Sequence, residues 1–298
     1  MIESPYAAAL ARIPVSAHRV EVDGTETAWW EYGESDAPVL VLVHGFRGDH
    51  HGLEPVVAQL PGYRIISPDL PGFGESATFA DRAHDIDGYA RWLGAFIEAV
   101  GLRDGAYDLL GHSFGSIVSS AAVAGGLAPR RLVLVNPIGA PALQGPRGVM
   151  TRLAVLYYRA SAALPEKAGF ALLRNGAVVR IMSVTMAKTN ERELRRWIHD
   201  QHDRYFSDFG DRDQLLEAFR ASVSHDVSEY AERITVPTLL VAAERDDVTP
   251  IEAQHRLVGR FPDARLEVIP EVGHLIHYET PGDAAARIGR FLRAEADA

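Results

Sequence analysis

Short, uniformly apolar runs are the feature that most limits the folds open to this chain of 298 residues. Val39–Val43 reads Val-Leu-Val-Leu-Val, which is too evenly apolar for a strand with one exposed face and is typical of a buried parallel strand. Similar runs recur at residues 64–67, 107–110, 132–135, 238–242 and 266–269. Parallel strands need long crossover connections, which are usually helical. The repetition therefore predicts an α/β architecture.

Helical patterns lie between several of these runs. Apolar residues at three- and four-residue spacing form one face over 86–100, recur directly after Ser113, and return in the tail at 281–296. Residues 18–32 alternate around Asp23-Gly24, which predicts a hairpin at the edge of the sheet. Strands that alternate with helices predict a mostly parallel sheet of the eight-stranded type with helices on both faces.

The alternation stops between Asn136 and Pro237, where about a hundred residues contain amphipathic helical patterns and no convincing buried strand. A segment of this length is too long for a simple loop. We therefore predict an α-helical cap inserted between two strands of the sheet. The expected division is a first core part at 1–137, a cap at 138–233 and a second core part at 234–298.

Composition excludes several classes of function. A formal charge of -10 argues against binding of a nucleic-acid backbone, which needs clustered Lys and Arg. The chain has no cysteine, which excludes disulfides, thiolate metal sites and a cysteine nucleophile. No apolar run approaches the roughly 18 residues of a membrane span, and residues 1–18 do not resemble a signal peptide. We expect a cytoplasmic enzyme without a membrane span.

Gly111-His-Ser-Phe-Gly115 is the strongest catalytic signal. It follows a strand pattern and precedes a helical one, which is the context that gives Gly-x-Ser-x-Gly its meaning. A sharp strand-to-helix turn needs almost no side chain two positions either side of its apex, and the two glycines provide that room. Ser113 would then stand above the sheet, at a helix N-terminus that favours negative charge. The alternative is that Ser113 is an ordinary N-cap.

A second loop predicts an oxyanion site. His44-Gly45-Phe46 follows the run Val39–Val43, so the backbone N–H groups of Phe46 and Phe114 are the expected oxyanion donors. Asp49-His50-His51 comes shortly afterwards and raises the hypothesis of a metal site. Because adjacent histidines point in different directions on most backbones, we expect a solvated loop there and no metal.

The acid and base candidates follow the last two strand patterns. His274 and His277 come after the run at 266–269 and are the candidate bases. Asp247 lies closer to Pro250 and to the helix expected there, so local chemistry favours Asp246 as the acid. The acidic candidates are Glu244, Asp246 and Asp247. The resulting chain order Ser, Asp, His is one of the known orders of the catalytic triad.

Five segments in this order resemble the α/β-hydrolase superfamily, and in particular its capped branch of esterases, lipases and carbon–carbon bond hydrolases. They are His44-Gly-Phe46, Asp69-Leu-Pro-Gly-Phe-Gly-Glu-Ser76, Gly111-His-Ser-Phe-Gly115, Asp246 before Pro250, and Gly273-His274. The resemblance implies that Ser113 is the nucleophile, Asp246 the acid and His274 the base. Some members carry the acid one strand earlier, where this chain has Asn136, which cannot serve. Ser116 departs from the family, which often has a second glycine there.

We therefore expect hydrolysis of a carboxylic ester of a small, largely apolar substrate through an acyl-enzyme on Ser113. The alternatives are a carbon–carbon bond hydrolase or lyase on the same residues, and a ligand receptor. No cofactor is expected, because no Gly-rich phosphate loop follows the first parallel strand. Large cap side chains either line a substrate pocket or pack the cap helices together. They include Tyr157, Tyr158, Met182, Met186, Trp197 and Phe206.

Overall fold

The computed structural model describes residues 2–140 and 148–293. In them a single sheet of eight strands runs in the order β1-β2-β4-β3-β5-β6-β7-β8. Antiparallel pairing is confined to β1 with β2 and β2 with β4, and the remaining pairs are parallel. The strands are β1 (Val15–Val22), β2 (Thr25–Tyr32), β3 (Val39–Val43), β4 (Arg64–Pro68), β5 (Tyr107–His112), β6 (Leu132–Val135), β7 (Thr238–Ala243) and β8 (Ala264–Ile269).

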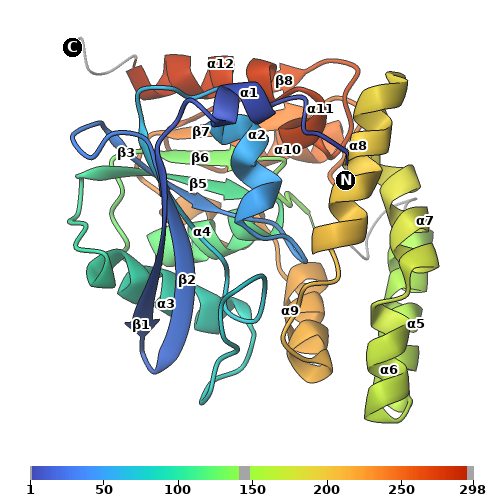
Figure 1. Cartoon of the computed structure of the whole chain (residues 1–298). Coiled ribbons are helices and arrows are strands. Elements are labelled where there is room, and N and C mark those ends of the chain that lie inside the picture. The colour runs from blue at the N-terminus through green and yellow to red at the C-terminus, as the bar shows by residue number, and fades with distance from the viewer. Residues whose placement is uncertain (1, 141–147, 294–298) are drawn as a thin grey trace.

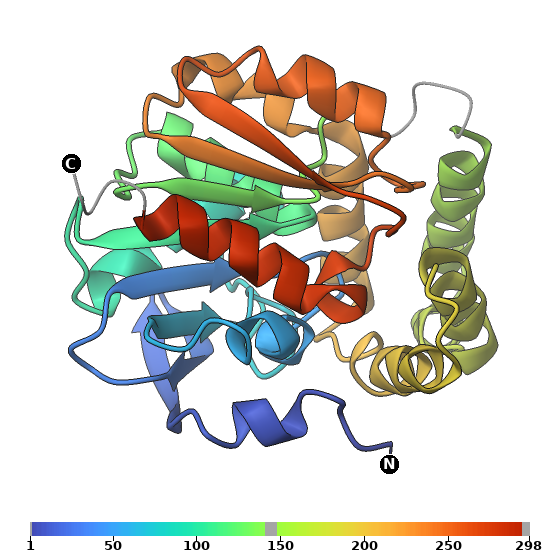
Figure 2. The same ribbon diagram turned by 90° about the horizontal axis from the view of Figure 1, so that it is seen from above.

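Helices cover both faces of this sheet, as Figures 1 and 2 show from two directions. On one face α3 (Ile86–Ala99) and α4 (Phe114–Ala124) bury their apolar sides against the central strands. On the other face α2 (Glu54–Val57) and α12 (Pro281–Arg293) form a second apolar core. The predicted fold class is therefore confirmed, and so is the edge hairpin around Asp23-Gly24.

The remaining short helices are α1 (Ala7–Leu10) before β1, η1 (His50–Leu53), α10 (Ile251–Val258) and α11 (Ile276–Glu279) in the core, and η2 (Val227–Glu229) and η3 (Ala231–Arg233) shortly before β7. The tail helix α12 ends at Arg293, and residues 294–296 of the expected helix lie outside the described residues. No helix in the described parts of the chain has the length and apolar character to cross a membrane.

Helices occupy most of the long connection between β6 and β7, beside the core in Figure 1. Residues 141–147 of this connection lie outside the described residues. We keep the name cap for residues 138–233. Its α-helices are α5 (Gly148–Ala163), α6 (Glu166–Leu173), α7 (Gly176–Met186), α8 (Arg192–Tyr205) and α9 (Arg212–Ser224).

The loop after β4 packs against the cap. Phe73 forms an isolated antiparallel bridge with Phe209, and the Gly210 N–H donates to the Gly72 carbonyl at 3.0 Å. A Cβ on Gly72 would lie 2.4 Å from the Gln214 side chain of α9, and φ at Gly72 is 85°. Glycine therefore permits the close approach of this core loop to the cap.

Candidate active site

Ser113 stands at the turn between β5 and α4 with φ 52° and ψ -116°. An L-residue with positive φ is strained by roughly 1–2 kcal/mol, so the surrounding structure must hold the turn in place. Every residue from Tyr107 to Val123 is buried except Ser113, which is half-buried. The turn therefore exposes one hydroxyl from an otherwise buried strand and helix.

Gly111 and Gly115 allow this turn because backbone atoms occupy the space where their side chains would lie. A Cβ on Gly111 would stand 2.4 Å from the Gly115 carbonyl oxygen. A Cβ on Gly115 would stand 2.2 Å from the carbonyl oxygen of Val43, at the end of β3. The glycine at 115 therefore also sets how closely α4 approaches the neighbouring strand.

Replacing Gly115 with alanine is expected to destabilise the protein by roughly 1–3 kcal/mol, because the backbone of β3 must move to admit the methyl group. Gly94 of α3 is the matched control, since a Cβ there meets nothing within 4 Å. Gly94→Ala should be neutral or stabilising, as alanine favours a helix interior over glycine. Denaturant unfolding of both variants measures the difference, and equal midpoints would contradict the steric argument.

Ser113, His274 and Asp246 form a continuous chain of hydrogen bonds. Ser113 Oγ lies 2.9 Å from His274 Nε2, and His274 Nδ1 lies 2.8 Å from Asp246 Oδ2. The carboxylate accepts, so Nδ1 carries the proton and Nε2 is left to accept from the serine hydroxyl. The structure thus brings together three residues that are distant in sequence, each from a different strand end.

Asp246 is held as an anion. Burial alone would raise its pKa, but the neighbouring His274 and several hydrogen bonds outweigh this, so the pKa lies below its ordinary value. Oδ1 accepts from the backbone N–H of Val248 at 2.7 Å and of Thr249 at 3.0 Å, and the Thr249 hydroxyl donates to Oδ2. The Asp-x-x-Thr spacing is the sequence signal for this turn.

The other acidic candidates and His277 have different surroundings. Glu244 accepts from the Glu271 N–H, and Asp247 forms an ion pair with Lys188 of the cap. The ring of His277 packs against that of His112, with centroids 4.2 Å apart. The residue that contacts both Ser113 and Asp246 is His274.

Asn136, directly after β6, supports His274, the candidate base. Sequence reasoning missed this role of Asn136. Its side-chain amide donates to the His274 carbonyl at 2.7 Å, and its oxygen accepts from the Ala243 N–H at 3.0 Å. The side chain is fully buried. Asn136 therefore ties the His274 segment to β7, and its place at a strand end was the available signal.

The loop after β3 meets the turn at Ser113. A Cβ on Gly45 would lie 3.3 Å from the Ser113 Cβ, so this loop and the nucleophile turn are in contact. Phe114 is the first residue of α4, where an N–H has no acceptor within the helix. Among the described residues, the Phe46 N–H donates to no protein acceptor. Both amides are thus available beside Ser113.

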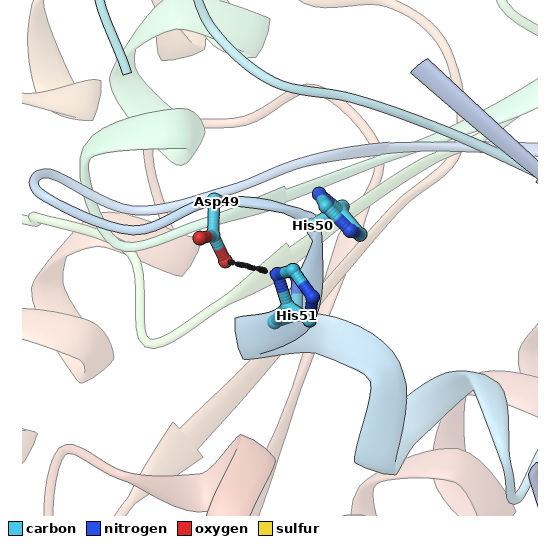
Figure 3. Close-up of side chains that lie close together, drawn as sticks. All are labelled: Asp49, His50 and His51. Atoms are coloured by element: carbon cyan, nitrogen blue, oxygen red, sulfur yellow. Dashed lines mark hydrogen bonds and ion pairs between the residues drawn. The ribbon is translucent and has the colours of Figure 1, made fainter. Parts of the chain in front are cut away.

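Asp49 and His50 are buried and His51 is half-buried, so the expectation of a solvated loop was wrong. Figure 3 shows the three side chains close together, with Asp49 paired to His51. Asp49 pairs with His51 at 3.3 Å, and His50 Nδ1 lies 2.9 Å from Asp69 Oδ1. Trp30 stacks on the His50 ring. The ligand atoms of the three residues lie within 4.8 Å of one another, close enough to be considered for a metal ion. Their contacts with one another, with Asp69 and with Trp30 enclose Asp49 and His50, and Tyr205 of the cap stacks on the His51 ring.

Three buried histidines come from different elements: His112 ends β5, His202 lies in α8 of the cap and His277 lies in α11. Burial lowers the pKa of His112 to about 3 and that of His202 to about 3, and it holds the pKa of His277 well below the ordinary value. Neighbouring imidazoles act in the same direction. These rings are therefore neutral in the folded protein at neutral pH.

Acidification below the ordinary histidine pKa of about 6.5 is expected to destabilise the fold. Below this pH the unfolded chain binds protons that folded His112 and His202 do not. Each of the two residues therefore lowers the free energy of unfolding by about 1.4 kcal/mol for every pH unit between about 6.5 and about 3. Denaturant unfolding at a series of pH values measures this slope. His202→Gln, which cannot be protonated, should flatten it, whereas a pH-independent unfolding free energy would contradict the prediction.

Among the large cap residues named above, Tyr158 and Trp197 pack helices together. The Tyr158 ring stacks on the Phe219 ring with their centroids 3.8 Å apart, and the Trp197 ring packs edge-on against that of Tyr278. The rings of Tyr158 and Phe219 also pack against the Phe46 ring, with centroid distances of 6.1 and 6.0 Å. The cap thereby extends an aromatic cluster onto the loop beside Ser113.

Comparisons with known proteins agree with this fold. A model described as the Alpha/beta hydrolase family matches residues 40–288. The dihydrolipoyllysine-residue acetyltransferase component of the acetoin cleaving system of Pseudomonas putida is 30% identical over 286 residues, covering 92% of this chain and 69% of that protein. The 2-hydroxy-6-oxo-6-(2'-aminophenyl)hexa-2,4-dienoic acid hydrolase of Metapseudomonas resinovorans is 26% identical, with coverage of 93% and 91%.

A solved structure shares the fold at lower identity. Carboxylesterase CesB from Bacillus subtilis superposes with a TM-score of 0.76 at 19% identity, covering 97% of this chain and 96% of that chain. The mostly parallel sheet and the strand–turn–helix at Ser113 define the α/β-hydrolase class. The chain belongs to the Alpha/beta hydrolase family and is an enzyme of the hydrolase type.

Proposed function

We propose that this protein is a serine carboxylesterase that hydrolyses small, largely apolar esters through an acyl-enzyme on Ser113. The observation that carries the proposal is the half-buried Ser113 hydroxyl at the end of the hydrogen-bond chain through His274 to Asp246. Buried anionic Asp246 favours the imidazolium that forms when His274 takes the serine proton.

The reaction follows from which of these groups carries a proton before the substrate is attacked. Ser113 Oγ attacks the ester carbonyl while His274 Nε2 accepts its proton, and the same nitrogen then protonates the leaving alcohol. In the second half, His274 takes a proton from water, which attacks the acyl carbon; the bond to Ser113 Oγ breaks, and His274 returns the proton to Ser113 as the carboxylic acid leaves. The N–H groups of Phe46 and Phe114 stabilise the tetrahedral oxyanion in both halves, at no reorganisation cost because they belong to the backbone.

The aromatic cluster around Phe46 supports an apolar substrate. Its ring contacts those of Phe73, Phe114, Tyr158 and Phe219, with centroid distances between 5.9 and 6.2 Å. Two of these partners come from the core and two from the cap. We therefore assign residues 138–233 the role of a cap that shields the acyl-enzyme from bulk water.

Carbon–carbon bond cleavage is the second candidate, since the relative from Metapseudomonas resinovorans bears the name of a dienoic acid hydrolase. Such a substrate carries a carboxylate, which needs a cation to bind it. Arg47 lies in the loop after β3 that carries Phe46, here called the oxyanion loop (residues 44–48), and it is buried and donates to cap carbonyls. This arrangement favours an uncharged ester.

Incubation with p-nitrophenyl esters of short carboxylic acids tests the proposal. We expect a burst of p-nitrophenol and a mass increase equal to the acyl group on Ser113. A fluorophosphonate should label the same residue. Wild-type protein that neither hydrolyses the esters nor takes up the probe would exclude the proposed function, and cleavage of a vinylogous diketone acid without ester hydrolysis would favour the second candidate.

A further inference from the structure

Arg47 occupies a strained backbone position immediately after Phe46. The Gly48 N–H donates to the Gly45 carbonyl at 3.0 Å, which closes a turn over Gly45–Phe46–Arg47–Gly48. At the third position of this turn Arg47 has φ 60°, in the region where glycine or asparagine is the usual residue. A non-glycine residue remains in this conformation when contacts outside the turn hold it there.

The side chain of Arg47 makes those contacts with the cap. Its Nε donates to the Phe206 carbonyl at 2.8 Å, and its Nη2 donates to the Leu173 carbonyl at 2.9 Å. Its Nη1 donates to the Tyr158 hydroxyl at 3.2 Å. The side chain is 1% exposed, although it belongs to a loop of the core. Arg47 therefore joins the oxyanion loop to the cap.

The docked cap also compensates the charge of Arg47. The three hydrogen bonds of its guanidinium go to uncharged oxygen atoms of the cap. Leu173 is the last residue of α6 and Phe206 is the C-cap of α8, so two helix C-termini, each with about half a negative charge, face the guanidinium. The Phe206 and Phe209 rings lie 4.7 and 5.3 Å from Cζ.

We propose that Arg47 is a positioning residue that couples docking of the cap to assembly of the oxyanion hole. This proposal rests on the proposed hydrolytic function. While the cap is docked, its carbonyls hold the Arg47 side chain and with it the strained turn that carries the Phe46 N–H. When the contacts are lost, the turn relaxes and the Phe46 donor leaves the oxyanion position. Full catalysis therefore requires a docked cap.

Arg47→Met is the sharpest test, because methionine keeps much of the volume, stays strained at the positive φ and removes the hydrogen bonds to the cap. If the side chain positions the oxyanion donor, kcat for p-nitrophenyl esters should fall about 10²-fold with KM unchanged within about twofold, as expected for a contact made in the transition state. Arg47→Gly also removes the contacts but relieves the backbone strain, so its kcat should fall less than that of Arg47→Met. The rate of fluorophosphonate labelling at Ser113 should fall in parallel.

Arg174 provides the matched control. It donates to the Phe209 carbonyl at 3.1 Å and lies over the Phe170 and Phe209 rings, so it is a cap arginine with similar chemistry and no contact with the oxyanion loop. Arg174→Met should leave kcat within about twofold of wild type. Hydrogen exchange should rise at the C-termini of α6 and α8 in the Arg47 variants and not in this control.

The outcomes separate this proposal from the proposed function. Wild-type protein without esterase activity would refute the proposed hydrolytic function. Active wild-type protein with an equally active Arg47→Met variant would overturn the role of Arg47 alone. If the Arg47 variants do not fold, Tyr158→Phe decides, since it deletes one acceptor of the guanidinium and retains the stacked ring. Its kcat should fall severalfold at constant KM, and an unchanged kcat would overturn the proposal.

Discussion

Replacement of Ser113 by alanine is expected to lower kcat for ester hydrolysis by about 10⁶-fold. Without the hydroxyl, His274 has no nucleophile to activate, because its Nε2 lies 2.9 Å from the Ser113 Oγ that is removed. The residual rate would come from the oxyanion donors and substrate binding. Steady-state kinetics with p-nitrophenyl esters measures the loss, and labelling by a fluorophosphonate should disappear with it.

Ser120 is the matched control for this substitution. It is a fully buried serine of the same helix, and its position in α4 is two turns from the nucleophile. Ser120→Ala should retain kcat within about twofold. Equal loss of activity in the two variants would mean that the effect comes from packing of α4, and an active Ser113→Ala protein would remove Ser113 from the mechanism.

Replacement of Asp246 by asparagine is expected to lower kcat by about 10⁴-fold while the fold is retained. Oδ1 of Asp246 accepts two backbone N–H groups, so the asparagine carbonyl should keep that place and its NH₂ should face His274. Nδ1 of His274 would then have to accept a hydrogen bond, and the proton would move to Nε2. A protonated Nε2 cannot take the proton of Ser113.

Asp247 supplies the control, because it is adjacent in sequence but exposed and paired with Lys188. Asp247→Asn should retain kcat within about twofold, since its carboxylate pairs with Lys188 while Asp246 is the partner of His274 Nδ1. Rates of both variants measured with the same ester decide between the two carboxylates. A large loss of kcat in Asp247→Asn with little loss in Asp246→Asn would assign the role of the acid to Asp247.

Features that depend on short stretches of chain were predictable. The even apolar character of Val39–Val43 requires burial on both faces, and β3 lies inside the sheet between β4 and β5. The Asp23-Gly24 pair favours a two-residue turn, and β1 and β2 pair across it. In each case local backbone preference and apolar pattern point to the same structure as the tertiary fold.

The candidate triad was predictable for a related reason. Parallel strands end at one edge of the sheet, so residues that directly follow β5, β7 and β8 are brought to the same region whatever lies between them. Ser113, Asp246 and His274 each follow one of these strands, and the structure joins them by hydrogen bonds. The sequence favoured Asp246 over Asp247, and in the structure Asp246 is the residue whose Oδ2 lies 2.8 Å from His274 Nδ1.

Contacts between the core and the cap could not be predicted, because they join residues far apart in sequence. Arg47 donates to Phe206, 159 positions away, and nothing near Arg47 indicates that its charge would be buried. Asp49 and His50 looked like loop residues of polar type, and their burial follows from contacts with Trp30, Asp69 and other distant residues. Burial is a property of the assembled structure and has no local pattern for a polar side chain.

The sequence by itself determined the sheet, the strained turn at Ser113 and the order of the candidate catalytic residues, because these follow from apolar periodicity, glycine placement and strand ends. The tertiary structure alone decided how the cap meets the oxyanion loop, why Asn136 matters to His274, and which histidines stay neutral. Hydrogen-bond partners and desolvation arise when distant segments pack together, so no stretch of sequence specifies them on its own.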